Sequence, residues 1–261
     1  MKESLGDRLG WYFDLVRFKV YASLVAESAR TYLGFLWWIL EPIFLIGVYY
    51  VVFGIYLSFD RIEFVPLLIV GVTSWQWVNR SVMNSTQSIL NKANVLTKLN
   101  INRLIMPMTD LISDSIKMLV ILIVVILILN VMGYPLNARY SYLPLVFTAQ
   151  GLLIAALSLW GALLVPFAQD LRYVISLALR ALMLGSGVFY NLDRIPATLQ
   201  QTFLMNPVAS IIESYRKILI YQETPLLFHL GWTTVTALLF IVAAVLFERS
   251  FRQRYTVLLA T

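Results

Sequence analysis

Three charged side chains inside long apolar stretches, Glu41, Arg80 and Arg180, are the residues best suited to chemistry with an ionic ligand. Ionisable residues within apolar helices are costly, so they usually face a partner or a water-filled path. Counted at about 1.5 Å per residue, all three lie at one depth, near the end of their helices where Lys and Arg gather. We therefore expect Glu41 to pair with Arg80 or Arg180 near the mouth of a conduit.

Two interpretations of this cluster stay open. The charges form a structural ion pair that no ligand touches, or at least one arginine is left to bind an anionic phosphate. Pro42 follows Glu41 directly and removes a hydrogen bond from the helix, which favours a bend there.

Other kinds of catalysis find no support in the residues. The chain has no cysteine and one histidine, His229, so thiol chemistry and histidine-rich metal sites are not expected. No glycine is followed by lysine, which excludes the phosphate-binding G-x-x-x-x-G-K-[ST] motif, and there is no G-x-S-x-G elbow. We predict no catalytic residue, no metal and no cofactor bound by this chain. A membrane-embedded glycosyl- or acyltransferase stays as the weaker alternative.

The composition indicates a membrane protein, because 60% of the 261 residues are hydrophobic and only 13% are charged. A helix needs about 20 largely apolar residues to cross a bilayer. We expect an all-α fold with six spans, at 35–59, 65–90, 111–133, 142–168, 173–190 and 226–247. Lys and Arg flank the ends on the side of both termini, which are therefore expected in the cytoplasm. The net charge of +6 reflects these flanks rather than a nucleic-acid partner.

The first 34 residues precede any span and have a helical pattern of their own. Apolar residues recur at spacings of three or four, at Leu5, Leu9, Phe13, Val16, Val20 and Leu24. This pattern predicts a helix that lies in the membrane interface. A short soluble helix packed on another element is the alternative.

The stretch 65–90 is the most polar of the six. A helix this polar should not face lipid, so it either lines a cavity or a subunit interface, or packs inside the bundle. Trp75 and Trp77 on this stretch, with Tyr50 on the first, are the best candidates for stacking on sugar faces. Aromatic residues also form belts at both membrane surfaces, and this second interpretation stays open.

The segment 191–225 carries signals for two short helices. Pro196 opens the first, and Asn206 followed by Pro207 is the pattern of a helix N-cap with proline in the first turn. Beyond it, Tyr215 falls on the apolar face of the second helix. We expect two re-entrant helices that dip into the membrane from outside; an amphipathic cap resting on the outer surface is nearly as well supported.

Three segments resemble a known family. These are "ARTYLGFLWWILEPIFLIGVYYVVFG" (29–54), "NKANVLTKLNINRLIMPMTDLI" (91–112) and "MNPVASIIESYRKILIY" (205–221). They resemble, in the expected order, the permease subunits of type-2 ABC exporters of bacterial surface polysaccharides, and most closely the branch that exports O-antigen. Two features depart from the family: "NRLIMP" replaces its basic proline-containing element, and Glu41 stands where a neutral residue is more usual.

The resemblance implies a homodimer docked on two Wzt-type ATPase subunits, which bind ATP and Mg. The complex would move undecaprenyl-pyrophosphate-linked O-antigen across the bacterial inner membrane; capsule, teichoic-acid, small-lipid or drug export are alternatives. One domain would cover 1–261: interfacial helix 1–34, spans one to five in 35–190, gate helices 191–225, last span 226–247 and tail 248–261. ATPase contacts would lie in the coupling segment 91–110, at Asn91, Lys92, Asn94, Lys98 and Arg103. The outer gate would use Pro196, Asn206, Pro207 and Tyr215.

Overall fold

The structure is a computed structural model that describes residues 5–56, 61–92 and 102–258. Every regular element in these ranges is helical, which confirms the predicted all-α class. The first half contains α1 (Leu5–Ala29), α2 (Trp37–Tyr49), α3 (Arg61–Thr86), α4 (Ser88–Asn91) and α6 (Ile105–Val131). The second half contains α7 (Leu143–Leu164), α8 (Leu171–Gly185), α9 (Ala197–Leu204), α10 (Pro207–Leu219) and α11 (Leu227–Leu258).

Four helical segments of the described chain are long and apolar enough to cross a membrane. They are Gly34–Tyr56, Ile105–Val131, Ala138–Leu164 and Leu227–Phe251, which match the first, third, fourth and sixth predicted spans. The other two predicted spans correspond to α3, which is 26 residues long but polar, and α8, which has only 15 residues. A helix of about 20 residues spans a bilayer, so α8 is shorter than the predicted stretch 173–190. The six-span topology therefore stays a prediction.

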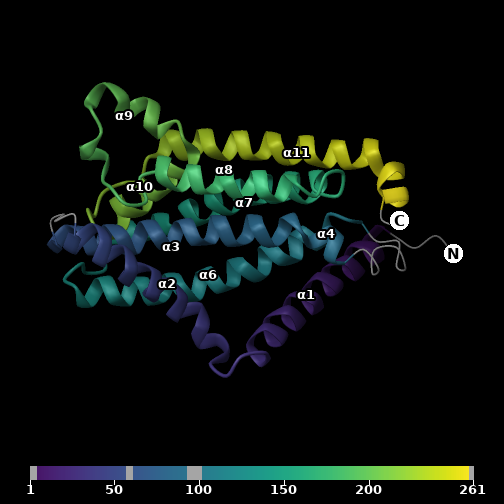
Figure 1. Cartoon of the computed structure of the whole chain (residues 1–261), viewed down its shortest axis with the longest axis horizontal. Helices are drawn as coiled ribbons and strands as arrows, with labels where there is room; N and C mark the ends of the chain where they lie inside the picture. The colour runs from purple at the N-terminus through teal and green to yellow at the C-terminus, as the bar shows by residue number, and fades with distance from the viewer. Residues whose placement is uncertain (1–4, 57–60, 93–101, 259–261) are drawn as a thin grey trace.

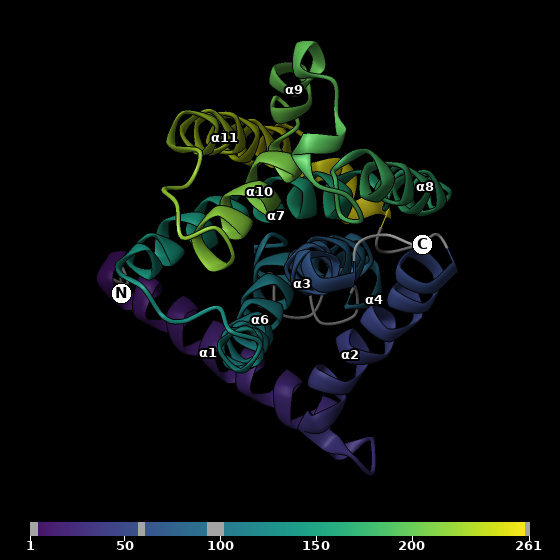
Figure 2. The same cartoon turned by 90° about the vertical axis from the view of Figure 1, so that its left-hand side faces the viewer.

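The polar helix α3 lies in the middle of the bundle (Figure 2). It packs on α6, α7, α8 and α10, and most of its residues are buried. Some of its polar side chains find partners across these contacts; for example, Gln150 of α7 donates to the hydroxyl oxygen of Ser74 at 3.1 Å. Trp77 stacks on Phe147 with ring centroids 4.4 Å apart. Helix α3 therefore packs inside the bundle, and among its residues with a described burial only Asn79 and Asn84 are exposed.

Helix α1 leaves the bundle diagonally and forms a V with α2 (Figure 1). Val20 of the predicted apolar stripe is buried, but Phe13 is 68% exposed, so that part of the stripe does not face the bundle. Phe18 and Tyr21 are exposed as well. Apolar residues therefore lie on more than one side of α1, because one side packs on α6 while others point away from the protein.

Helix α2 continues through Pro42, which is buried, and changes at Tyr50 to a π-helical turn that runs to Tyr56. The change in helix geometry therefore falls two turns beyond the predicted bend. π-Helical turns often accompany functional sites, and here the turn follows the part of α2 that faces α3.

The segment after α8 packs directly on the α3 backbone. Gly187 has a φ of +70°, which reverses the chain at a position suited to glycine. A Cβ added at Gly71 would lie 2.5 Å from the carbonyl oxygen of Val188, so this close approach requires glycine on α3. Arg216 of α10 secures the same turn by donating to the carbonyl oxygens of Val188 at 3.1 Å and Tyr190 at 3.0 Å.

Candidate functional site

A groove of about 140 Å³ lies between α2, α3 and the end of α8. Five of its residues come from one face of α3 and recur every three to four positions: Val72, Trp75, Gln76, Asn79 and Arg80. The remaining wall comes from α2 and from the segment that begins at Met183. The full lining is Glu41, Leu45, Tyr49, Val72, Trp75, Gln76, Asn79, Arg80, Met183 and Val188.

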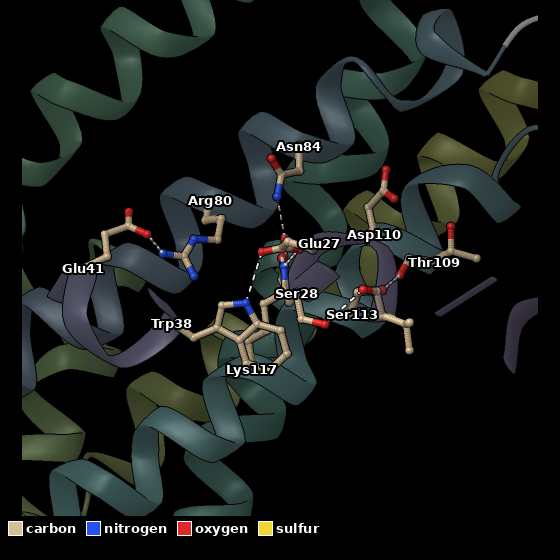
Figure 3. A network of polar contacts seen from close by, with 12 residues as sticks. Glu27, Ser28, Trp38, Glu41, Arg80, Asn84, Thr109, Asp110, Ser113 and Lys117 are labelled. Atoms are coloured by element: carbon tan, nitrogen blue, oxygen red, sulfur yellow. Dashed lines mark hydrogen bonds and ion pairs between the residues drawn. The ribbon is translucent and has the colours of Figure 1, made fainter. Parts of the chain in front are cut away.

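An ion pair joins the two sides of the groove. Arg80 Nη2 lies 2.5 Å from Glu41 Oε2, and the side chains are 20% and 54% exposed (Figure 3). This confirms the prediction that Glu41 pairs with one of the two arginines at its depth. Within the described residues this is the only hydrogen bond that Arg80 makes, so Nε and Nη1 are available to a ligand.

Arg180 is not the partner of Glu41. It is exposed on α8, does not line the groove, and forms no ion pair with any residue that the structure describes. Similar depth did not decide between the arginines, because depth says nothing about which helix neighbours α2.

The aromatic candidates divide in the same way. Both tryptophans are buried, at 5% and 4% exposed, but Trp75 lines the groove, whereas Trp77 packs on the other side of α3 against Phe147. Two residues along a helix turn the side chain by about 200°, so the two tryptophans cannot share a face. Tyr50 does not line the groove; Tyr49, which the sequence reasoning missed, does.

Gln76 and Asn79 are further groove residues that the sequence reasoning did not select. Both side-chain amide atoms of Gln76 are buried without a hydrogen-bond partner in the described parts of the chain. Buried polar atoms are nearly always paired, so an amide left open on a groove wall is a candidate ligand contact. The signal was available, since both residues follow from the helical repeat through Trp75 and Arg80.

A second polar cluster lies one helical turn beyond Arg80 along α3, at Asn84, and is called the Lys117 network (Figure 3). Lys117 of α6 donates to Glu27 of α1 at 2.5 Å and to Asp114 at 3.1 Å. Glu27 also accepts from the indole nitrogen of Trp38 at 3.1 Å, and Asn84 of α3 donates to Asp114 at 3.0 Å. The network therefore links α1, the start of α2, α3 and α6.

Burial makes the Lys117 network strongly dependent on every partner. The side chains of Lys117 and Asp114 are 5% and 3% exposed. Removing one member of a buried ion pair leaves an uncompensated charge and typically costs about 3–5 kcal/mol. The sequence alone did not predict this network, because Glu27 and Lys117 are 90 positions apart and lie on different predicted elements.

Part of the predicted coupling segment can be placed. Asn91 ends α4, Lys92 pairs with Asp110 at 2.6 Å, and Arg103 pairs with Glu248 of α11 at 3.5 Å. Asn94 and Lys98 lie outside the described residues. These elements lie at the end of the molecule where α1 begins (Figure 1).

Lys19 of α1 joins this region, since its ammonium group donates to the sulfur of Met106 at 3.1 Å. Burial lowers the pKa of Lys19, and the neighbouring charge of Lys92 lowers it further.

The predicted gate residues lie at the opposite end. Asn206 caps α10 as predicted, accepting from the backbone nitrogen of Val208 at 3.0 Å, with Pro207 in the first turn. Its amide also donates to Ser186 at 2.9 Å, which connects α10 to the end of α8. Pro196 precedes α9. Tyr215 is 1% exposed in the core, so its side chain packs inside the subunit and does not border an opening.

Comparison with known proteins shows which family this chain resembles. Residues 81–220 match the model of the ABC-2 type transporter family. Two proteins of Klebsiella pneumoniae, both called O-antigen export system permease protein RfbA, are 26% identical over 211 residues, 80% of this chain and 82% of theirs. A protein of the same name from Myxococcus xanthus is 24% identical over 217 residues, 82% of this chain and 83% of its own.

Proposed function

Since this chain belongs to the ABC-2 type transporter family, we propose that it is the channel-forming permease of an ATP-driven exporter of lipid-linked O-antigen. The observation that carries the proposal is the groove, in which an aromatic ring, two amides and an arginine line one side of α3. Aromatic faces stack on sugars, amides bond to hydroxyl groups, and a guanidinium group binds phosphate. A sugar chain attached to an undecaprenyl pyrophosphate presents all three ligand types.

The groove is open on one side, which supports a homodimer. The exposed surfaces of α2 and α8 are apolar, with Phe44 and Val48 exposed on α2 and Val174 and Leu177 exposed on α8. A second copy that covers these surfaces would convert two half-open grooves into one channel with a continuous wall. In the bilayer, α3 and α8 would complete six spans, with α3 shielded from lipid by its neighbours.

Energy would come from two Wzt-type ATPase subunits that bind ATP and Mg. Docking would involve α1 and the segment around Asn91, Lys92 and Arg103, together with Asn94 and Lys98. Closure of the ATPases would move these elements and, through α3, the groove wall. Helices α9 and α10, with Pro196, Asn206 and Pro207, would form the outer gate in the inner membrane of a bacterial cell.

The test is export in cells that lack their own permease and receive this chain with its ATPase. We expect O-antigen on the cell surface with the native chain and about twofold to twelvefold less with Trp75→Ala, because one stacking contact contributes about 0.5–1.5 kcal/mol. Trp232→Ala, which removes a half-exposed ring on α11, is the control and should export normally. Because Trp75 is buried, export is compared per amount of folded permease in the membrane.

Export that continues when the ATPase is inactive would refute the proposal. Equal losses from Trp75→Ala and Trp232→Ala would show that the groove is not the path. Export of a capsule or teichoic acid in place of O-antigen would keep the transport role and correct the substrate.

A further inference from the structure

A second cleft, lined by α2, α3 and α6, differs from the groove in its chemistry. Its volume is about 200 Å³, and its lining is apolar except for Thr73. Pro42, Ile43 and Ile46 form the α2 wall, whereas Glu41 and Leu45 of the same helix face the groove. Helix α2 therefore separates a polar space from an apolar one, and only the second suits a hydrocarbon chain.

The polar floor of this cleft follows from the helical repeat. Four residues before Pro42 lies Trp38, and four residues before Ile121 lies Lys117; residues four apart share a helix face. The Lys117 ammonium lies 5.6 Å from the centre of the Trp38 ring, and both side chains contact Glu27 of α1 (Figure 3). One end of the cleft therefore lies next to the Lys117 network, which joins α1 to the start of α2.

The accessible charge on this floor is negative. Two carboxylates, Glu27 and Asp114, share the single ammonium group of Lys117, which leaves a surplus of one negative charge. Asp114 and Lys117 are buried, whereas the Glu27 side chain is 47% exposed. A cationic group that approaches the floor therefore meets Glu27, and the exposed Arg30 three residues later offers a cation for an adjoining phosphate.

Thr73 provides an independent sign that the cleft holds a ligand. Thr73 is 3% exposed and lines the cleft, and its hydroxyl oxygen has no hydrogen-bond partner in the described chain. A buried hydroxyl without a partner is unfavourable, and the ester oxygens of a lipid would supply an acceptor. A whole helix is about 10–12 Å across, too wide for a cleft of about 200 Å³, whereas a single acyl chain is much narrower.

We propose that this cleft binds one phospholipid of the cytoplasmic leaflet with an ammonium-bearing head group. One acyl chain lies along Ile43, Ile46 and Ile121, and the head-group ammonium donates to Glu27 at the junction of α1 and α2. The site needs only that the junction of α1 and α2 lies at the cytoplasmic surface of a membrane, so it is independent of the transported cargo. A bound lipid here fills the angle between the helix at the membrane surface and the first span.

The experiment is native mass spectrometry of the full chain purified in detergent with equal amounts of phosphatidylethanolamine, phosphatidylglycerol and phosphatidylcholine. We expect one phosphatidylethanolamine retained per chain in preference to the other two. Glu27→Gln should lower this retention by about tenfold, the factor that one charge-assisted hydrogen bond represents. Glu223→Gln, which alters an exposed ion-paired carboxylate elsewhere, should leave it unchanged.

The acyl-chain half of the site has its own matched pair. Ile43→Trp fills the cleft and should abolish retention, whereas Val48→Trp adds the same ring to an exposed position on α2 that does not line the cleft. Equal retention of the three lipids, or equal effects of the two tryptophan variants, would overturn the proposal. A change from dimer to monomer with Ile43→Trp alone would also overturn it, since the cleft would then hold a second copy. None of these results depends on export activity.

Discussion

At the scale of single residues, Arg80 determines the ionic character of the groove. Its guanidinium group bonds to Glu41 with Nη2 and, among the described residues, makes no other hydrogen bond. The pair is partly exposed, and such pairs contribute about 0–1 kcal/mol to stability. The ion pair thus orients Arg80 while contributing little to the fold, which suits a residue that binds a passing phosphate.

Arg80→Gln should therefore lower export by about tenfold or more, because a charge-assisted bond to phosphate is lost, while the melting temperature changes little. Arg180→Gln is the comparison, since Arg180 has the same chemistry but does not line the groove. Surface O-antigen and thermal melting of the purified chain measure the two effects. If Arg180→Gln reduces export as strongly, the substrate path includes α8 and the groove assignment must be extended.

Lys117, unlike Arg80, contributes mainly to the stability of the fold. Lys117→Met leaves Asp114 buried without its cation, and we expect the free energy of unfolding to fall by about 3–5 kcal/mol. Lys217→Met is the matched variant, since Lys217 pairs with a Glu223 side chain that is 57% exposed, and it should cost about 0–1 kcal/mol.

Thermal melting of the detergent-purified chain measures both losses. Adding Asp114→Asn to Lys117→Met should restore part of the stability, because the buried charge is removed with its partner. Similar melting temperatures for Lys117→Met and Lys217→Met would mean that water reaches the Lys117 network.

At the scale of elements, α3 holds the groove in place through backbone contact as well as side chains. Gly71 allows the segment after α8 to lie against α3, and Arg216 binds that segment from α10. A groove wall made from a turn needs such support, since a turn has no internal ladder of hydrogen bonds to keep its shape. The opposite wall, α2, relies mainly on packing against α3 and α6.

Gly71→Ala tests this close approach. The added methyl group would lie 2.5 Å from the Val188 oxygen and 2.9 Å from Arg216, so we expect a large drop in melting temperature and in the yield of folded protein. Gly47→Ala is the control, because nothing lies within 4 Å of its added Cβ and alanine favours the helix by about 1 kcal/mol. Normal melting of Gly71→Ala would show that the turn separates readily from α3.

At the scale of the whole molecule, the number of spans depends on α8. If its 15 residues cross the membrane together with the turn that follows, α9 and α10 lie outside; if they do not, these helices lie in the cytoplasm. The apolar exposed residues Val174, Leu177 and Leu184 on α8 favour a position in the bilayer. The polar contacts of α3 are made within the bundle, so its crossing does not require contact with lipid.

The absence of cysteine makes this topology directly measurable. Three variants each carry one cysteine at an exposed position: Leu136→Cys, Gln169→Cys and Leu199→Cys. Whole cells that express each variant are treated with a membrane-impermeant maleimide. Six spans predict labelling of the first and third from outside, and of the second only after permeabilisation. Protection of Leu199→Cys alone would show that α8 does not cross.

Sequence alone determined the membrane class, the positions of the four apolar spans, the N-cap of α10 and the shared depth of Glu41 and Arg80. These follow from local rules, because span length, helical repeat and capping depend on residues close together in the chain. Depth is fixed by the rise per residue, so it can be counted without knowing which helices are neighbours.

Tertiary structure decided which of these residues meet. It selected Arg80 over Arg180 and placed Trp75 beside the groove and Trp77 against Phe147. It also assembled the Lys117 network from Glu27, Trp38, Asn84 and Asp114. The apolar cleft and the groove lie on different sides of α2. Such choices depend on the order and rotation of helices around α3, and these are set by packing between segments far apart in the chain.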